Sequence, residues 1–232
     1  MNKKQLQKEL EDLRDEELEV KNIDTILEDE QIPKGCKVFN LQCSIMFVDV
    51  RGSTSMTLMN GSRDMTKIYK MLSKLVIKAV EENKGKVKDI AGDGFLCIFK
   101  NENKLASGAN AINSAILIND CIKDCYNTIV ESDWKITCGI GIMTGNVFMS
   151  KIGLRGKTKK SQVVYPSKIT NGASKLCEKA EGNEIIFDKL THDQIKDKKI
   201  KKKCKEKTEN KYKVFKKLCS EIWLIRCDDN EK

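Results

Sequence analysis

The chain has 232 residues, of which 40% are hydrophobic, and this is enough for the core of one domain with short appendages. It contains no run of about 18 apolar residues, and charged residues begin at its third position. We therefore expect neither a membrane-spanning helix nor a secretory signal peptide. The net charge of +9 equals the excess of positive charge in the segment 196–217, which holds twelve lysines and three acidic residues. The rest of the chain is neutral, so a nucleic-acid partner is not favoured. This segment is predicted to be a solvated loop or helix, and a phosphate-binding or RNA-binding segment is the alternative.

The ten cysteines are scattered singly, and no two of them form a CxxC pair. Several lie in apolar, periodic segments, namely Cys97, Cys121, Cys125 and Cys138. This distribution indicates reduced, buried thiols and predicts a cytoplasmic protein.

In chain order, residues 1–35 are predicted to form a charged extension with one amphipathic helix outside the core. Residues 36–232 are predicted to form a single domain with a lysine-rich insertion at about 195–217. Strands are predicted at 41–50, 87–90, 95–99, 134–144, 146–152, 184–187 and 221–226, and residues 163–165 are expected to lead into the third helix. Helices are predicted at 64–82, 105–130 and 168–180. Hairpins are expected to turn at 91–94 and 144–146. This alternation indicates an α+β fold with a ferredoxin-like βαββαβ core and additional C-terminal strands.

Two aspartates stand at the ends of predicted strands. Asp49 ends the apolar run IMFVDV, and Asp93 lies between two glycines in KDIAGDGFLCIF. In this topology the two strands are neighbours, so both carboxylates can reach one point, where they suit Mg²⁺ or Mn²⁺ with bound phosphates. The loop Arg51, Gly52, Ser53 and Thr54 follows directly and is predicted to turn backbone amides toward a triphosphate. An ordinary Asp-Gly hairpin turn is the alternative for Asp93.

Four segments, FVDVRGST, GDGFLCIF, GIGIMTGNVFMSKIG and TNGASKL, resemble the signature blocks of the class III nucleotidyl cyclase domain and follow the family's order. The resemblance implies a homodimer with active sites at the subunit interface. It implies that Asp49 and Asp93 bind two Mg²⁺ or Mn²⁺ ions, with the Val50 carbonyl as a further ligand. Those ions bridge a nucleoside triphosphate, activate its 3′-hydroxyl and help pyrophosphate to leave.

The helix opened by PSKITNGASKL places Lys168, Asn171 and Lys175 on one side. By the resemblance, Asn171 orients the ribose and Lys175 takes the place of an arginine that stabilises the phosphate transition state. Lysine keeps the charge but loses the two-pronged geometry of arginine. A solvated polar stripe is the alternative interpretation.

The positions that select the base differ from those of adenylate cyclases. That family has a lysine and an aspartate where this chain has Asp89 and Lys168, the opposite residues. Aspartate only accepts hydrogen bonds and lysine only donates them, so a base with a ring N–H and a carbonyl is predicted, either uracil or guanine. A salt bridge between Asp89 and Lys168 that never meets a base is the alternative.

The VRGST loop, the TKIYK segment and the lysine of SKL resemble bacterial pyrimidine cyclases of anti-phage signalling, which favours UTP as the substrate. In that family the cyclic nucleotide activates a separate effector protein. The alternatives are a guanylate or adenylate cyclase, or an inactive cyclase-like module that binds nucleotide or RNA. The segment GLRGKT lacks the first Walker glycine, nothing resembles GGDEF, and the single histidine, His192, excludes histidine-based nucleophilic chemistry.

Overall fold

The computed structural model describes residues 2–102, 106–153, 161–208, 212, 215 and 219–227. The chain divides into two compact units, Met1–Leu41 with Phe148–Pro166 and Gln42–Val147 with Ser167–Lys232. Every predicted site residue belongs to the second unit. The boundary between residues 35 and 36 stays a prediction.

The second unit is built on a βαββαβ sequence of elements. These are β2 (Lys37–Val50), α2 (Ser53–Glu82), β3 (Gly85–Ala91), β4 (Gly94–Lys100), α3 (Ser107–Cys121) and β5 (Cys138–Gly153). The sheet order β3-β4-β2-β5 is that of a ferredoxin-like fold, so the predicted fold class is confirmed. The sheet continues with β7 (Glu184–Asp188), β9 (Ile222–Arg226) and β8 (Lys205–Glu206). The predicted C-terminal strands are thus present as well.

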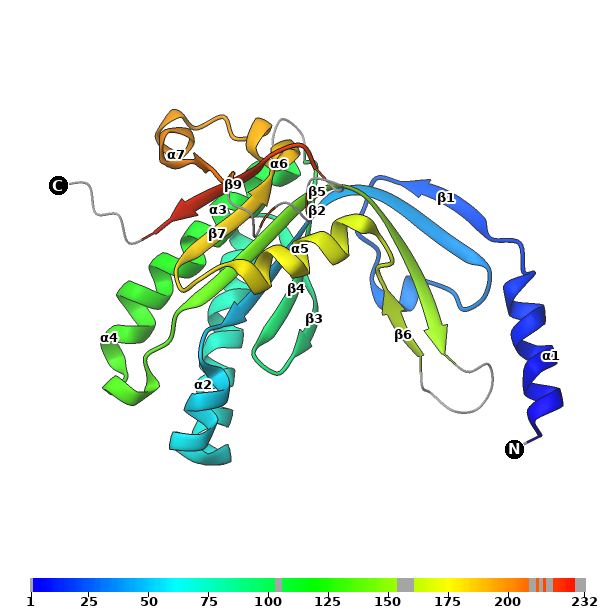
Figure 1. Ribbon diagram of the computed structural model, residues 1–232, viewed down its shortest axis with the longest axis horizontal. Helices are drawn as coiled ribbons and strands as arrows, with labels where there is room; N and C mark the ends of the chain where they lie inside the picture. Colours follow the sequence, from blue (N-terminus) through cyan, green and yellow to red (C-terminus); the bar gives the residue numbers. More distant parts are fainter. Residues whose placement is uncertain are drawn as a thin grey trace. The chain divides into compact units, whose positions relative to one another are not determined.

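Helices cover both faces of this sheet (Figure 1). Ile140 and Ile142 of β5 are fully buried in the core that α2 and α3 share with the sheet. Gly141 between them faces α5 (Lys168–Lys179), because a Cβ atom at position 141 would overlap the α5 backbone at Ala173 and Cys177. Alternate residues of one strand therefore contact different helical layers.

Helix α2 begins directly after β2, eleven residues earlier than predicted. Gly52 precedes it in the left-handed conformation (φ 75°), which a glycine adopts without strain and which turns the chain sharply into the helix. Gly61 has φ 69° and ψ 168° and interrupts α2, so the predicted segment 64–82 corresponds to its second part.

The predicted hairpin at 144–146 is wrong, because β5 runs through these residues without a turn. Gly145 does not have a positive φ angle, and a side chain there would meet Ile169 of α5. The glycine thus makes room for a helix rather than for a turn. The predicted helix at 105–130 is confirmed as α3, followed by the π-helical η2 (Ile122–Tyr126) and α4 (Asn127–Ile129).

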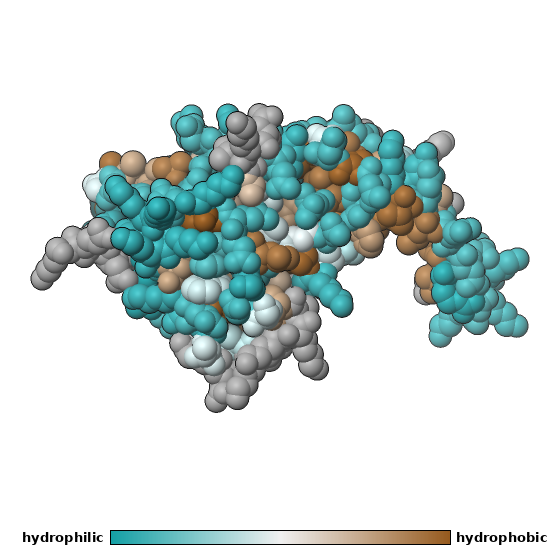
Figure 2. All heavy atoms as spheres, turned by 90° about the horizontal axis from the view of Figure 1, so that it is seen from above, coloured by the Kyte–Doolittle hydropathy of each residue, from teal (hydrophilic) through white to brown (hydrophobic). Residues whose placement is uncertain are grey.

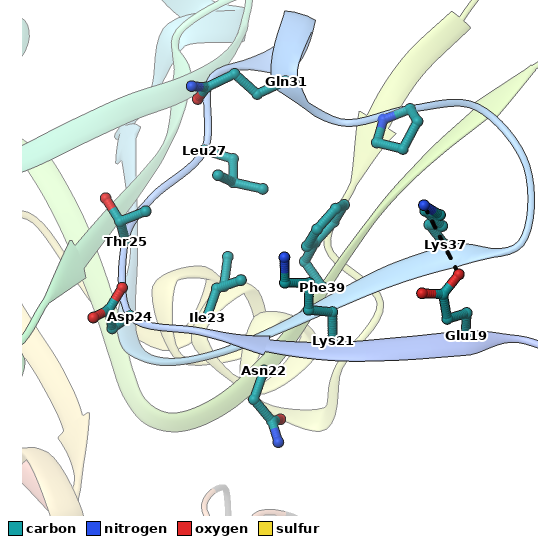
Figure 3. A pocket seen from close by; sticks show the side chains of 11 residues that line it. Glu19, Lys21, Asn22, Ile23, Asp24, Thr25, Leu27, Gln31, Lys37 and Phe39 are labelled. Carbon is teal, nitrogen blue, oxygen red and sulfur yellow. Dashed lines mark ion pairs between the residues drawn. The ribbon is translucent and has the colours of Figure 1, made fainter.

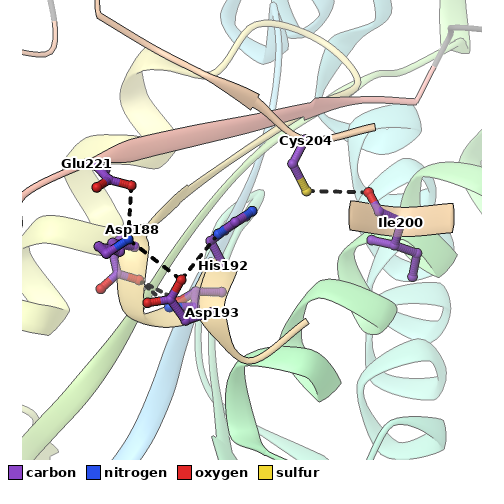
Figure 4. A network of polar contacts seen from close by, with 8 residues as sticks. Asp188, His192, Asp193, Ile200, Cys204 and Glu221 are labelled. Atoms are coloured by element: carbon purple, nitrogen blue, oxygen red, sulfur yellow. Dashed lines mark hydrogen bonds and ion pairs between the residues drawn. The ribbon is translucent and has the colours of Figure 1, made fainter. Parts of the chain in front are cut away.

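The short helices of the second unit are η3 (Ser132–Trp134), α6 (Lys189–Asp193) and α7 (Lys198–Lys203). Helix α7 begins the lysine-rich segment, and much of 209–218 lies outside the described residues. Asp188, labelled in Figure 4, caps α6. Its buried carboxylate accepts hydrogen bonds from the Thr191 amide (3.2 Å) and hydroxyl (2.5 Å). Burial raises the pKa of Asp188 to about 6, against these hydrogen bonds.

The first unit contains α1 (Lys3–Arg14), β1 (Glu19–Ile23), η1 (Asp29–Gln31) and β6 (Ser161–Val164), with the outer parts of β2 and β5. Helix α1 has no buried residue, in agreement with the prediction of a helix outside the core. Strand β1, which was not predicted, pairs in parallel with β2. The residues around β1, β2 and the segment that joins them enclose a hollow of about 950 Å³, which no predicted site residue lines (Figure 3).

Within the described part of the chain, no helix is both long enough and apolar enough to cross a membrane. Hydrophilic residues cover most of the face seen in Figure 2, where apolar residues form separate patches.

Candidate active site

The two predicted carboxylates come together at the paired ends of β2 and β4. Asp49 lies opposite Gly94 in the antiparallel register, and Asp93 directly precedes Gly94 in the turn that joins β3 to β4. Partial burial, and then the negative charge of Asp93, raise the pKa of Asp49, while Arg51 acts in the opposite direction. The two acidic side chains are therefore electrostatic neighbours, although 44 residues separate them in the chain.

The surroundings of Asp49 fit a hard divalent cation. Its side chain is 40% exposed, and its Oδ1 atom lies close to Gly94, which has no side chain. The Val50 side chain is apolar and buried in the core, so only its backbone carbonyl oxygen can be a metal ligand. In the described ranges, no group of three or more His, Cys, Asp or Glu side chains is placed to hold a metal. Further ligands must be carbonyl, water or phosphate oxygens, which is how Mg²⁺ is usually held.

The loop after β2 leads into the N-terminus of a helix. Gly52 is the N-cap residue of α2, and Ser53 and Thr54 form its first turn. The first N–H groups of a helix have no acceptor within the helix and favour an anion. Gly52, Ser53 and Thr54 thus have the backbone arrangement that the sequence predicts for a phosphate site.

Arg51, which is also predicted to bind phosphate, contacts protein groups instead. Its Nη1 atom donates to Asp49 Oδ2 at 2.9 Å, and its Nη2 atom donates to the Cys177 carbonyl of α5 at 2.6 Å. Its backbone amide donates to the Thr137 carbonyl at 2.9 Å. Phosphate binding by Arg51 stays a prediction, and these contacts give it no support.

A cavity of about 230 Å³ lies beside Asp49. It is lined by Phe47, Val48, Asp49, Gly94, Ser174, Cys177 and Glu178. Ser174, Cys177 and Glu178 are not among the site residues predicted from the sequence. Their spacing of three and four residues places them on one side of α5, a signal that helical periodicity contains.

Helix α5 presents its other predicted residues to solvent. The Ser167 hydroxyl caps the helix by accepting from the Thr170 amide at 2.9 Å, while Ala173 and Leu176 are buried. Lys168, Asn171 and Lys175 are exposed, and their side chains form no hydrogen bond or ion pair with the residues described. The chain by itself places Ser174, Cys177 and Glu178 beside Asp49, rather than Asn171 or Lys175.

Asp89 lies on β3 where the pairing with β4 shifts register, and it is exposed. Its Oδ1 atom accepts a hydrogen bond from the Ile90 amide at 2.9 Å. Across the described ranges, no ion pair joins Asp89 to Lys168. Both side chains are therefore accessible to a ligand or to a second chain.

Comparison with known proteins identifies the family and the fold. The family described as "Adenylate and Guanylate cyclase catalytic domain" matches residues 39–225. Among solved structures, the adenylyl cyclase CyaB from P. aeruginosa covers 84% of this chain and 97% of its own, with a TM-score of 0.66 at 16% identity. The guanylyl cyclase Cya2 covers 80% of this chain and 91% of its own, with a TM-score of 0.63 at 15% identity.

Curated relatives are more similar in sequence over shorter stretches. A protein of Burkholderia cepacia named "Uridylate cyclase" is 26% identical over 136 residues, which are 57% of each chain. An uncharacterised protein of Mycobacterium tuberculosis (strain ATCC 25618 / H37Rv) is 27% identical over 139 residues, 60% of this chain. The match spans 24% of the length of that mycobacterial protein. Because the family match takes in most of the chain, including both Asp49 and Asp93, this chain belongs to the adenylate and guanylate cyclase catalytic domain family.

Proposed function

We propose that the chain is a nucleotidyl cyclase that converts a nucleoside triphosphate, preferably UTP, into its 3′,5′-cyclic monophosphate and pyrophosphate. The observation that carries the proposal is the convergence of Asp49 and Asp93 at the paired ends of β2 and β4. Two carboxylates at an open edge, with few neutralising partners, suit a site for divalent cations and phosphates.

Each predicted residue has a task in this reaction. Asp49, Asp93 and the Val50 carbonyl would hold two Mg²⁺ or Mn²⁺ ions, which when bound polarise the phosphates and favour ionisation of the 3′-hydroxyl. The amides of Ser53 and Thr54, with Gly52, would bind phosphate oxygens at the start of α2. On α5, Asn171 would orient the ribose and Lys175 would offset the charge that develops on the phosphate.

We place the active sites at the interface of a homodimer. Asn171 and Lys175 are exposed and free of side-chain partners in the described chain, and they are not grouped with Asp49. A second copy that presents its α5 face to the carboxylates would complete each site, and a C₂ dimer would contain two such sites.

The preference for uracil rests on Asp89 and Lys168. Aspartate accepts the ring N–H of uracil and lysine donates to its carbonyl oxygen, whereas adenine presents the opposite pattern. The name of the Burkholderia relative supports the same base. Guanine shares this donor and acceptor pattern and is the second candidate.

The product would act as a second messenger in anti-phage defence, where a separate effector protein binds the cyclic nucleotide. This part of the proposal is supported by the resemblance of the VRGST, TKIYK and SKL segments to bacterial pyrimidine cyclases. Measuring cyclic UMP before and after phage infection, in cells that produce the chain, tests it. No increase on infection would contradict the signalling role.

The enzymatic proposal is tested by incubating the full chain with Mn²⁺ and each of the four ribonucleoside triphosphates. Cyclic nucleotides and pyrophosphate are then quantified by liquid chromatography and mass spectrometry. Cyclic UMP is expected to be the main product. Equal turnover of ATP would overturn the base assignment, and nucleotide binding without turnover would support the inactive module instead.

A further inference from the structure

Arg51 connects a predicted metal-binding carboxylate to the helix that carries the predicted catalytic residues. One guanidinium nitrogen donates to Asp49 Oδ2 at 2.9 Å, and another donates to the Cys177 carbonyl at 2.6 Å. Asp49 is on β2 and Cys177 is on α5, so a single side chain fixes the distance between the two elements. The planar guanidinium is suited to this role because its donors are held in a rigid fork.

The carbonyl that Arg51 contacts lies at the C-terminal end of α5. This helix ends at Lys179. The last four carbonyl groups of a helix receive no hydrogen bond in the regular helical pattern, so they can accept one from elsewhere. The Cys177 carbonyl also accepts from the Ala180 amide at 3.1 Å. A positive charge at a helix C-terminus opposes the partial negative charge of that end. Arg51 therefore acts as a cap for α5 that comes from the loop after β2, far away in the sequence.

The position of the guanidinium is closely defined by its surroundings. Its side chain is 25% exposed, and a Cβ atom at Gly139 of β5 would overlap it. The Cys177 thiol donates to the Gly139 carbonyl at 3.2 Å and lies 3.6 Å from Arg51 Nη2. Glycine at 139 and the end of α5 thus form a slot in which the guanidinium is held.

We propose that Arg51 is a positioning residue, which holds the Asp49 carboxylate and the end of α5 in fixed relation for cyclisation. This inference rests on the proposed function for its catalytic consequence. Arg51 donates to Asp49 Oδ2, whereas Asp49 Oδ1 lies near Gly94 and is not the atom that Arg51 contacts. Arg51 would orient the carboxylate without binding the substrate itself.

Kinetics separate this role from phosphate binding, the task that the sequence predicts for Arg51. Lysine at position 51 keeps the charge but lacks the fork that reaches Asp49 and Cys177 together. We expect Arg51→Lys to lower kcat about 10- to 100-fold and to leave KM for UTP within about twofold, because only the geometry of the reacting groups changes. A KM increase with unchanged kcat would show that Arg51 binds the triphosphate and would overturn the proposal.

Hydrogen exchange tests the link to α5 without any turnover. In the metal-free protein, Arg51→Lys and Arg51→Gln are expected to speed amide exchange in the last turn of α5 at least fivefold, and not in its first turn. Lys179→Gln is the matched control, since it removes a charge from the same helix end and has no contact with Asp49. Because it removes one favourable charge from the helix end but keeps the Arg51 hydrogen bonds, it is expected to speed exchange in the last turn by less than about twofold and to leave turnover unchanged.

Two outcomes decide between the proposals. Unchanged exchange in α5 of the Arg51→Lys variant would overturn the positioning role, whether or not the protein is a cyclase. If the wild-type protein forms no cyclic nucleotide while exchange in α5 still depends on Arg51, the cyclase assignment fails and the structural link remains. Arg51→Lys keeps a positive charge beside the Asp49 carboxylate, so this variant provides the test if Arg51→Gln does not fold.

Discussion

Gly139 of β5 provides the space that the Arg51 guanidinium occupies. A side chain at position 139 would overlap the Nη2, Nε and Cζ atoms of Arg51. The glycine is therefore required by a contact with a distant residue, and its own backbone has no unusual φ angle.

Replacing Gly139 by alanine is expected to displace Arg51 from Asp49 and Cys177. Overpacking at a buried position costs about 1–3 kcal/mol, so we expect the free energy of unfolding to decrease by this amount in urea titrations. Turnover is expected to fall as in Arg51→Lys. Gly145→Ala is the control, because its Cβ would meet only the flexible end of Ile169 and should cost less. Equal stability of the Gly139→Ala and wild-type proteins would contradict the predicted overlap.

Replacing either predicted metal ligand should abolish most of the activity. Asp49→Asn and Asp93→Asn keep the shape but remove the charge, and metal-ion catalysis is worth several kcal/mol, so each should lower kcat by about 100-fold or more. Mn²⁺ binding, followed by electron paramagnetic resonance, should weaken in parallel. The partly exposed Asp64, paired with Lys67 at 2.9 Å, provides a control in which Asp64→Asn leaves both quantities unchanged. Full activity of either variant would exclude that carboxylate from the site.

Exchanging the two base-selecting charges is expected to change the preferred nucleotide. The double variant Asp89→Lys with Lys168→Asp restores the acceptor and donor order of adenylate cyclases. Each mismatched polar group costs about 1–3 kcal/mol, so kcat/KM for ATP relative to UTP should increase at least about tenfold. Each single variant should lose activity with UTP. An unchanged ratio in the double variant would show that the pair does not contact the base.

The buried Asp188 makes stability depend on pH. Burial raises its pKa to about 6 in the folded protein, against 3.8 for an ordinary aspartate in the unfolded chain, so between these pH values the folded state binds the additional proton. The free energy of unfolding should therefore decrease as the pH rises from about 4 to 6 and level off above. Asp188→Asn keeps an acceptor for Thr191 and Thr144, and it should remove this part of the dependence. Urea titrations at several pH values measure the effect, and identical profiles for both proteins would contradict it.

The ferredoxin-like core could be read from the sequence because its signals are local. The Gly92-Asp93 turn between two apolar runs predicts the β3–β4 hairpin, and the periodicity of 64–82 predicts a helix. The hairpin predicted at 144–146 was wrong because its glycine has a role in tertiary packing. Gly145 was interpreted as a turn residue, whereas it allows β5 to pass close to Ile169. A sequence does not distinguish a glycine that turns the chain from one that admits a neighbour.

The sequence by itself determined the fold class, the two aspartates at strand ends and the polar face of α5, because each depends on residue type and short-range spacing. Only the tertiary structure decided the partners of these residues. Arg51 follows the first aspartate in a loop that reads as a phosphate site, yet its guanidinium contacts Cys177, 126 residues further along the chain. That pairing depends on where β2, β5 and α5 pack together, and on a glycine that leaves room between them. Such long-range contacts follow from the packing of whole elements, which no local pattern encodes.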